Sequence, residues 1–309
     1  MAKNIAKPAN IFQDYQSISS TKANFDEVYI QKDPRYYYQT LGKLDYVIPD
    51  VAFSIFQQIV SHLKLIKNKP ITILDLGCSY GNNAALLRYK LKFSQLFNRY
   101  NFLKGLDASE IIHLDKHYFN SWPADNDIKF IGLDISENAL TYAQKTGLIT
   151  DYICVNLEEK ELTPHQQSIL KYVDLIISTG CVGYVTEKTF QKIMACFDQE
   201  NVPWVSSFVL RMFPFNSIIK SLNKYGLNTE KLKGTTFLQR RFESQVEMDD
   251  VIKSLRSQKI STKGKETNGF LHTEFFLSRP QKSIDTKVIS DIVSVTTGVS
   301  KLYHHQRIV

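Results

Sequence analysis

The chain has 309 residues, of which 43% are hydrophobic and 22% charged, with 13 glycines and 9 prolines. This composition excludes a disordered or fibrous protein and predicts one large domain, or one domain with additions. No apolar run approaches the roughly 20 residues of a membrane helix, and the amino terminus lacks the apolar core of a signal peptide, so we expect a protein that does not enter a membrane.

In chain order, an amino-terminal arm (1–65) precedes a core (66–280) and a polar tail (281–309). The arm is tyrosine-rich and ends in a periodic apolar helix at 50–66. Within the core, apolar strands alternate with helices, which predicts an α/β fold with a doubly wound, mostly parallel seven-stranded sheet. The predicted strands are 71–77, 129–134, 151–157, 173–179, 203–213, 235–242 and 269–280, and the predicted helices between them are 82–91, 136–147, 187–199, 216–226 and 247–258.

The first predicted strand runs into the stretch "ILDLGCSYG" at 73–81. Gly77 and Gly81 allow a tight turn and a close approach of the backbone to a ligand, and Ser79 is a small residue between them. Asp75 ends the strand just before the turn, where it can accept hydrogen bonds from a ligand amine or from loop amides. In an open parallel sheet this carboxyl edge is where ligands bind.

This stretch resembles motif I of class I S-adenosylmethionine-dependent methyltransferases, the D-x-G-x-G-x-G loop, with Ser79 in place of the middle glycine. "FIGLDISENA" at 130–139 is similar to the family's second strand end, whose acid holds both ribose hydroxyls, and "CVNLEE" at 154–159 to its third, which contacts the adenine. The resemblance covers about residues 66–280 and implies S-adenosylmethionine as cofactor and S-adenosylhomocysteine as product. The cofactor-binding residues that it implies are Asp75, Gly77, Cys78, Ser79, Gly81, Asp134, Ile135, Asn156, Leu157 and Thr179.

A nicotinamide-binding Rossmann enzyme is the alternative for a glycine loop between a strand and a helix. Its pattern is G-x-G-x-x-G, which the spacing of Gly77, Ser79 and Gly81 does not supply. The loop therefore favours the methyltransferase.

Two similar stretches could each supply the aspartate that binds the ribose: "FLKGLDASEI" at 102–111 and "FIGLDISENA" at 130–139. Distance from the glycines favours Asp107, because the acid of a dinucleotide fold follows them by about 20 residues. The flanks favour Asp134, which has a strand before it and a helix and a further strand after it. We predict that Asp134 binds the cofactor and that 90–127 is an insertion after the first core helix, with Asp107 near the substrate.

The residues that perform the chemistry are less evident. Methyl transfer requires alignment above all, and a general base only if the acceptor loses a proton. The catalytic candidates are Tyr184, in "STGCVGYV" after the fourth strand, and His113, in "HLDKH". Each has a plainer interpretation, as a core aromatic and as a residue of a surface helix. The pair His113 and His117 has no third ligand nearby, so we expect no metal.

Substrate-binding candidates are Tyr37, Tyr184 and Arg211. Tyr37 lies in the run 35–38, which either covers the site or packs the arm. Arg211 lies near the end of a predicted strand, where it either binds an anion or forms an ion pair.

These observations predict a methyltransferase that acts on a small-molecule acceptor. The net charge of +7 is not gathered into basic blocks, so we expect no nucleic-acid partner. The four cysteines form no C-x-x-C pair, which is typical of reduced thiols in a cytoplasmic protein. An RNA or protein methyltransferase and a non-catalytic cofactor-binding protein are the alternatives.

Overall fold

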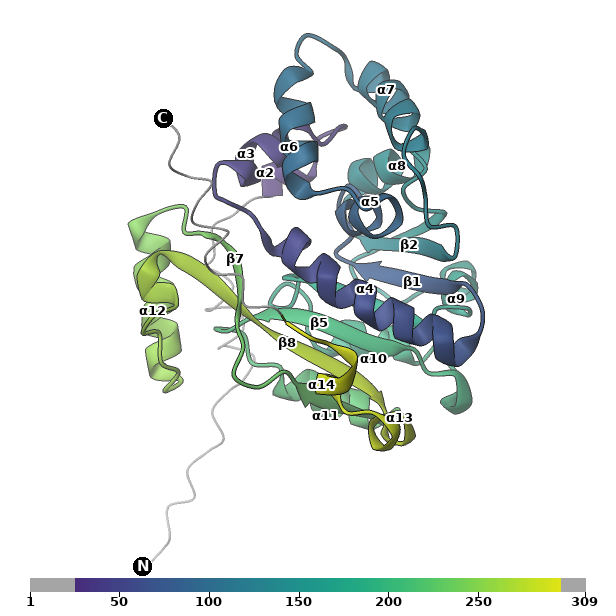
Figure 1. The fold of residues 1–309 in the computed structure, drawn as a ribbon, viewed down its shortest axis with the longest axis vertical. Helices are drawn as coiled ribbons and strands as arrows, with labels where there is room; N and C mark the ends of the chain where they lie inside the picture. The colour runs from purple at the N-terminus through teal and green to yellow at the C-terminus, as the bar shows by residue number, and fades with distance from the viewer. Residues whose placement is uncertain (1–25, 296–309) are drawn as a thin grey trace, which may run out of the picture.

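A twisted sheet of eight strands runs through the centre of the molecule (Figure 1). The computed structural model describes residues 26–295, and the structural statements below concern these residues. Seven of the eight strands run in one direction, and β8 is antiparallel to its neighbours β5, β6 and β7. The strands are β1 (Ile71–Leu76), β2 (Ile128–Asp134), β3 (Asp151–Cys154), β4 (Leu175–Thr179), β5 (Trp204–Leu210), β6 (Leu227–Lys231), β7 (Phe237–Arg241) and β8 (Phe270–Pro280).

The strand order is β3-β2-β1-β4-β5-β8-β6, with β7 also paired to β8. The chain thus moves outward from β1 to β3 and then returns to place β4 on the other side of β1. Ligands of doubly wound sheets bind at such a reversal, beyond the carboxyl ends of the two strands. The loops after β1 and β4 are therefore where the fold predicts a ligand-binding site.

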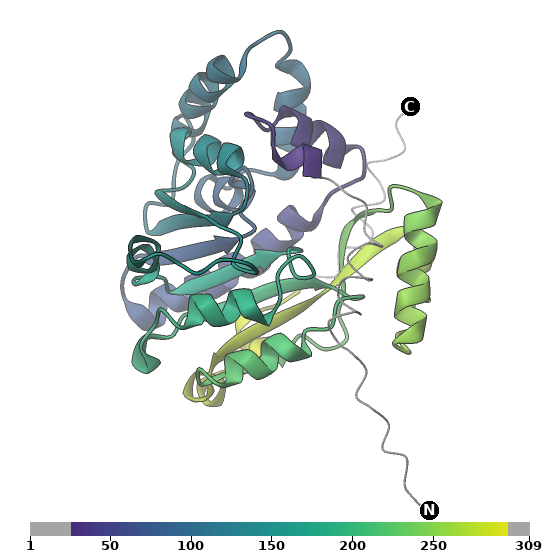
Figure 2. The same cartoon turned by 180° about the vertical axis from the view of Figure 1, so that it is seen from behind.

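Helices cover both faces of the sheet. On one face α4 crosses the strands beside α5 and α8 (Figure 1), and on the other lie α9, α10 and α11 (Figure 2). The helices are α2 (Asp26–Tyr29), α3 (Arg35–Gly42), α4 (Ile48–Lys67), α5 (Asn82–Tyr89), α6 (Phe93–Phe102), α7 (Ala108–Asn120), α8 (Glu137–Lys145), α9 (Pro164–Leu170), α10 (Glu187–Met194), α11 (Asn216–Asn223), α12 (Gln245–Ser257), α13 (Gln281–Thr286) and α14 (Ile289–Ile292).

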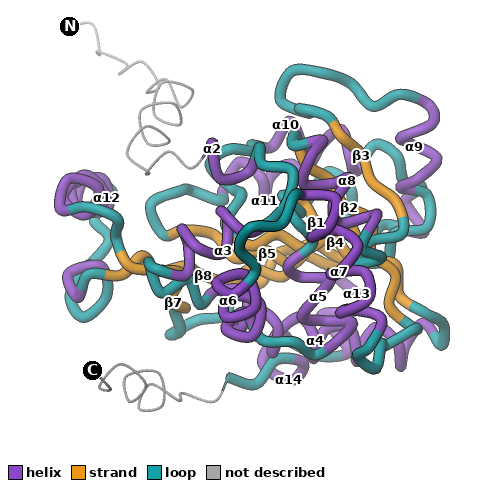
Figure 3. The backbone as a smooth tube through the Cα atoms, turned by 90° about the horizontal axis from the view of Figure 1, so that it is seen from above, coloured by secondary structure: helices purple, strands orange, loops and turns teal. Residues whose placement is uncertain are grey.

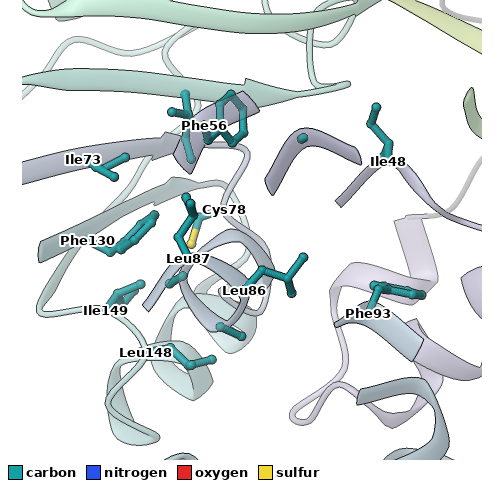
Figure 4. Packing of buried hydrophobic residues seen from close by; sticks show 14 of the residues in the cluster. Ile48, Phe56, Ile73, Cys78, Leu86, Leu87, Phe93, Phe130, Leu148 and Ile149 are labelled. Atoms are coloured by element: carbon teal, nitrogen blue, oxygen red, sulfur yellow. The ribbon is translucent and has the colours of Figure 1, made fainter. Parts of the chain in front are cut away.

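This double coverage explains the nearly continuous apolar strands. In β1, Ile73 packs into the core under α4 and Leu74 into the core on the opposite face. Figure 4 shows part of the first core, with Phe56 of α4, Ile73 of β1 and Phe130 of β2. The predicted α/β fold with a mostly parallel sheet is confirmed.

The structure adds elements that the sequence pattern did not predict. β6 was not expected, because "LNTEK" carries one apolar residue, and it forms at the outer edge of β8, where one side of the strand needs no apolar cover. The segment expected to be a tail begins with α13 and α14, and Ile289 and Ile292 of α14 are buried in the core beside α4.

Residues 1–25 of the expected arm and 296–309 of the tail lie outside the described residues. Of the helices in between, none is both long and apolar enough to cross a membrane.

Two further helices, α6 and α7, form within residues 90–127, and α3 of the arm packs against α6 (Figure 3). The carboxylate of Asp115, on α7, is completely buried and holds these parts together. It accepts hydrogen bonds from Arg99 of α6, from Tyr100 of α6 and from Tyr142 of α8. The ring of Tyr38, on α3, stacks on Tyr100 with 4.7 Å between centroids. Arm, insertion and core therefore meet at a single buried carboxylate.

Replacing Asp115 with alanine should lower the free energy of unfolding by about 3–5 kcal/mol, because Arg99 and two tyrosine hydroxyls lose their buried partner. Urea denaturation measures the change. Glu161→Ala is the control, since Glu161 pairs with Lys192 at 3.0 Å but its side chain is 79% exposed, and this change should cost less than about 1 kcal/mol. Equal losses in the two variants would contradict the role of Asp115.

Candidate functional site

The loop between β1 and α5 turns tightly at the carboxyl edge of the sheet. Gly77 has φ of +78°, and a Cβ atom there would lie 2.8 Å from the Cβ atom of Cys181 in the loop after β4. Ser79 adopts φ of +50°, unfavourable for a residue with a side chain. Its hydroxyl is buried and has no hydrogen-bond partner within residues 26–295. The thiol of Cys78 is buried in the core, which raises its pKa, so this residue presents backbone to the site.

Asp75, at the end of β1, is a buried carboxyl group that can accept a further hydrogen bond. Its Oδ1 accepts a hydrogen bond from Nδ2 of Asn83 at 2.9 Å, and the same amide reaches Oγ1 of Thr179 at the end of β4. Oδ2 has no partner in the described part of the chain. Burial raises the pKa of Asp75 to about 7, although the bond from Asn83 lowers it. Asn83, which was not among the predicted site residues, links the two strand ends from the first turn of α5.

Asp134 ends β2 and holds the neighbouring loop in place. Oδ2 accepts from the backbone amide of Ser79 at 2.8 Å, and Oδ1 accepts from the amide of Ser136 at 3.0 Å. Burial raises the pKa of Asp134, and these backbone hydrogen bonds oppose the rise. Each carboxylate oxygen can accept a second hydrogen bond. Asp134 therefore sets the loop and retains the capacity to bind a diol.

Asp107 has a different role from Asp134, despite its similar surroundings in the sequence. It is exposed and forms the N-cap of α7, where Oδ1 accepts from the amides of Ser109 and Glu110. The Ser109 hydroxyl, which donates to the same oxygen, contributes most to lowering the pKa of Asp107. No strand leads into Asp107, because residues 103–107 follow the end of α6. The choice of Asp134 as the strand-end acid is confirmed; its binding of a cofactor stays a prediction.

The other expected cofactor residues lie along the same edge. Ile135, next to Asp134, is 71% exposed, an unusual setting for a large apolar side chain. Asn156 and Leu157 follow β3. Oδ1 of Asn156 accepts from the amide of Glu158 at 3.1 Å, and the Leu157 side chain is buried. Together with Asp75 and Asp134, these residues form a row of candidate binding residues along the carboxyl edge of the sheet, from β1 to β3.

The loop after β4 lies beside the loop after β1. Gly180 and Gly183 both have positive φ, at +78° and +109°, and Sγ of Cys181 lies 3.0 Å from Oγ of Ser178. The ring of Tyr184 is 51% exposed. The side chain of Tyr184, a catalytic and substrate-binding candidate from the sequence, thus lies at the surface of this loop.

Residues 28–31 of the arm lie across the ends of β1 and β2. The hydroxyl of Tyr80, in the loop after β1, donates to the carbonyl oxygens of Val28 and Gln31. Beyond β2, the hydroxyl of Ser136 donates to the carbonyl oxygen of Tyr29 at 2.5 Å. This placement was not predicted, since the arm was assigned only by its composition.

A cluster of tyrosines connects the arm to this edge. The ring of Tyr37 is buried and lies in edge contact with Tyr29, Tyr38, Tyr46 and Tyr80. Burial raises the pKa of Tyr46 to about 12, and the charges of Asp75 and Cys181 also raise it. The hydroxyl groups of this cluster are therefore neutral near pH 7.

Two candidate residues lie elsewhere. Arg211 is buried, and its guanidinium donates to both carboxylate oxygens of Glu266, at 2.9 and 2.6 Å, and to the carbonyl oxygen of Ser261. Of the two interpretations of Arg211, the geometry favours the ion pair over substrate binding. His113 is on the exposed side of α7 against the ring of His117, 4.6 Å between centroids, while Asp115 between them points inward. No group of residues able to hold a metal ion occurs among the described side chains.

A cavity of about 340 Å³ lies between the arm and the insertion. It borders the candidate edge, because one of its lining residues, Gln31, also accepts the hydrogen bond from Tyr80. The lining residues are Gln31, Asp33, Arg35, Tyr36, Gln39, Leu103, Lys104 and Gly105.

Comparison with known proteins finds no matching family model and no matching curated protein. Among solved structures, the chain is similar to the plantazolicin methyltransferase BpumL, with 13% identity over 88% of this chain and 98% of that one, at a TM-score of 0.43. It is also similar to the plantazolicin methyltransferase BamL, with 12% identity over 88% and 99%, at a TM-score of 0.45. The magnesium protoporphyrin IX methyltransferase of Synechocystis PCC 6803 has 12% identity over 90% and 100%, at a TM-score of 0.34.

The strand order, the reversal between β1 and β4, and the glycine loop after β1 agree with the fold of class I methyltransferases.

The raised pKa of Asp75 predicts a characteristic pH dependence. In the unfolded chain an aspartate titrates near pH 4, so between about pH 4 and 7 the folded protein binds more protons at Asp75, and its stability falls as pH rises. The stability of Asp75→Asn relative to wild type should therefore increase from pH 5 to about 7 and then level off, as measured by urea denaturation. For Asp107→Asn the difference should stay constant over this range, because the lowered pKa of Asp107 keeps it ionised. A constant difference for Asp75→Asn would contradict the raised pKa.

Proposed function

We propose that this chain binds S-adenosylmethionine at the carboxyl edge of its sheet and transfers the methyl group to a small-molecule acceptor. The observation that carries the proposal is the pair of strand-end acids, Asp75 and Asp134, on either side of a glycine loop and both with unused acceptor capacity. A buried acceptor without a partner costs free energy, so its retention favours a ligand that supplies the donor.

The residues fit the separate parts of this cofactor. Asp134 would hold the ribose, whose two neighbouring hydroxyls are donors matched to a two-oxygen acceptor. Oδ2 of Asp75 would accept from the ammonium group of the methionine part, and the Ser79 hydroxyl would donate to its carboxylate. The exposed side chain of Ile135 would cover one face of the adenine, with Asn156 and Leu157 at the edge of the base.

The bound cofactor supplies a methyl group on a positively charged sulfur, which an acceptor lone pair displaces to leave the neutral thioether S-adenosylhomocysteine. The chain then has to align the acceptor and to exclude water. Residues 28–31 would exclude water, because they are hydrogen-bonded to the loops after both β1 and β2. In the nearby tyrosine cluster, Tyr46 has a pKa of about 12, which makes its hydroxyl a hydrogen-bond donor rather than a proton acceptor near pH 7.

A small acceptor is favoured by the cover over the site. The cavity of about 340 Å³ between the arm and the insertion is large enough for a compact organic molecule and adjoins the Tyr80–Gln31 contact. We propose that arm and insertion together form the acceptor pocket, with Tyr184 of the loop after β4 facing it, in a protein that acts in the cytoplasm. His113 remains a candidate proton acceptor only if α7 turns its exposed side to the substrate.

Asp134→Ala should weaken binding of S-adenosylmethionine about 10- to 100-fold, because two charge-assisted hydrogen bonds to the ribose and the tether of Ser79 are lost together. Titration calorimetry measures the affinity. Asp107→Ala is the matched control and should bind within about twofold of wild type, since Asp107 caps an exposed helix end.

The opposite pattern, with Asp107→Ala impaired and Asp134→Ala normal, would contradict the assignment of the cofactor site. If wild type binds a nicotinamide nucleotide and no S-adenosylmethionine, the proposed function itself is wrong.

The acceptor class is tested with a radioactive methyl donor in cell extract divided by size. Label in molecules below about 3 kDa supports the small-molecule acceptor, whereas label retained on RNA or protein would replace it with a macromolecular substrate. Cofactor binding without label in either fraction would indicate a non-catalytic binding protein.

A further inference from the structure

Gln239 occupies an irregular position in β7. Phe237 and Leu238 pair with Thr273 and His272 of β8, the pairing resumes at Arg240 with Leu271, and Gln239 between them has no partner residue. Such a β-bulge re-aims the side chain of the extra residue, and bulges are frequent next to active sites. Because Thr273 also pairs with Leu210, the last residue of β5, the bulge lies just beyond the carboxyl end of that strand.

The side chain of Gln239 is directed at the loop after β4. A Cβ atom built at Gly180 would lie 2.5 Å from Nε2 of Gln239, so the glycine makes room for the amide. The backbone carbonyl of Gln239 accepts from the amide of Val47 at 2.9 Å, next to Tyr46. Gly180 directly follows Thr179, whose hydroxyl accepts from the Asn83 amide that also bonds to Asp75. Gln239 thus belongs to the same edge as the proposed cofactor site, on the side away from the ribose.

The amide oxygen of Gln239 lacks a partner. The residue is 3% exposed, and its Oε1 has neither solvent contact nor a hydrogen bond to any residue in 26–295. By contrast, the half-buried amide of Gln258, just after α12, donates to the carbonyl oxygen of Met212 at 2.9 Å. Folding alone therefore gives no reason for an amide at position 239, where an apolar side chain of equal length would avoid an unsatisfied oxygen.

The surroundings indicate the chemistry of the missing partner. The guanidinium of Arg240, the next residue of β7, is paired with the carboxylate of Glu247 at 2.6 Å, so it does not present an unpaired positive charge to a ligand. Tyr46, next to Val47, lies in edge contact with the ring of Tyr37 at 6.4 Å between centroids, so aromatic rings adjoin this position, and the hydroxyl of Tyr46 is neutral. An uncharged ring carrying an N–H or O–H group suits such a site.

We propose that Gln239 is a substrate-positioning residue whose Oε1 accepts a hydrogen bond from an N–H or O–H group on a ring-bearing, uncharged methyl acceptor. This inference rests on the proposed function, since it places the acceptor beside the cofactor. The hydrogen bond fixes the direction in which the acceptor presents its lone pair. A hydroxyl group or a secondary amine loses its only donor proton when it is methylated, so the product cannot make this bond. Gln239 therefore selects the unmethylated acceptor over its product.

The test uses the full chain saturated with S-adenosylhomocysteine, whose binding is measured first by calorimetry. Phenol and anisole are the probes, because they differ by one methyl group on the donor oxygen, and ligand-observed NMR titration gives their affinities. Wild type should bind phenol about fivefold more tightly than anisole, the ratio that one neutral hydrogen bond provides. Gln239→Met should lose the preference, with its urea midpoint unchanged or raised and its affinity for S-adenosylhomocysteine within about twofold of wild type.

Gln258→Met is the matched control. It should lower the urea midpoint, because the carbonyl oxygen of Met212 loses its donor, and it should keep the preference for phenol. Should Gln239→Met fail to fold, Gln239→Glu at pH 8.5 replaces it, and its charged acceptor should raise the preference above that of wild type.

Each contrary result has a separate meaning. No binding of S-adenosylhomocysteine by wild type would refute the proposed function and with it this inference. Three results would refute the role of Gln239 alone, provided that wild type binds S-adenosylhomocysteine. These are the absence of a phenol preference in wild type, a phenol preference retained in Gln239→Met, and an unchanged or weaker preference in Gln239→Glu. A lowered urea midpoint for Gln239→Met with cofactor affinity intact would identify Gln239 as a structural residue.

Discussion

The hydrogen bond from the Ser79 amide to Asp134 is the contact on which the candidate site depends. It spans 2.8 Å and joins the loop after β1 to the end of β2. It acts together with the hydrogen bonds from the amides of Gly77 and Cys78 to the carbonyl oxygen of Leu133, and it stabilises Ser79 at its positive φ close to the strand ends. Asn83 makes the corresponding link on the other side, from Asp75 to Thr179. Three neighbouring strand ends are thereby fixed relative to one another before any ligand binds, which is the preorganisation that alignment of a reacting pair requires.

The arm and the insertion build on this fixed edge. Residues 28–31 bond to the loops after β1 and β2, while the Asp115 network ties α6, α7 and α8 together beneath the ring of Tyr38. The cover over the site is therefore supported from both sides, by short polar contacts at the edge and by a buried carboxylate behind it. A cover of this kind excludes water and leaves the acceptor only a limited volume, which is why arm and insertion belong to the proposed function and not merely to the fold.

Much of the fold was predictable because the strands are apolar on both faces and the turns carry their glycines. The choice of Asp134 over Asp107 also followed from local pattern, since Asp134 ends a strand and Asp107 caps a helix in a polar segment. β6 was not predictable, because an edge strand needs little apolar surface. The ion pair of Arg211 was not predictable for a related reason: its partner Glu266 lies 55 residues away in the sequence, and no local pattern indicates such a pair.

The sequence by itself determined the type of fold, the edge of the sheet that carries the site, and the residues of the glycine loop, because all of these depend on short-range periodicity and turn chemistry. Only the tertiary structure decided which polar atoms remain without partners. Oδ2 of Asp75, the hydroxyl of Ser79 and Oε1 of Gln239 are distinguished from other buried polar atoms of this edge by what surrounds them within residues 26–295. That environment comes from β2, β4, β7 and the arm, elements distant in the sequence, and satisfaction of a hydrogen bond is a property of their packing rather than of any one segment.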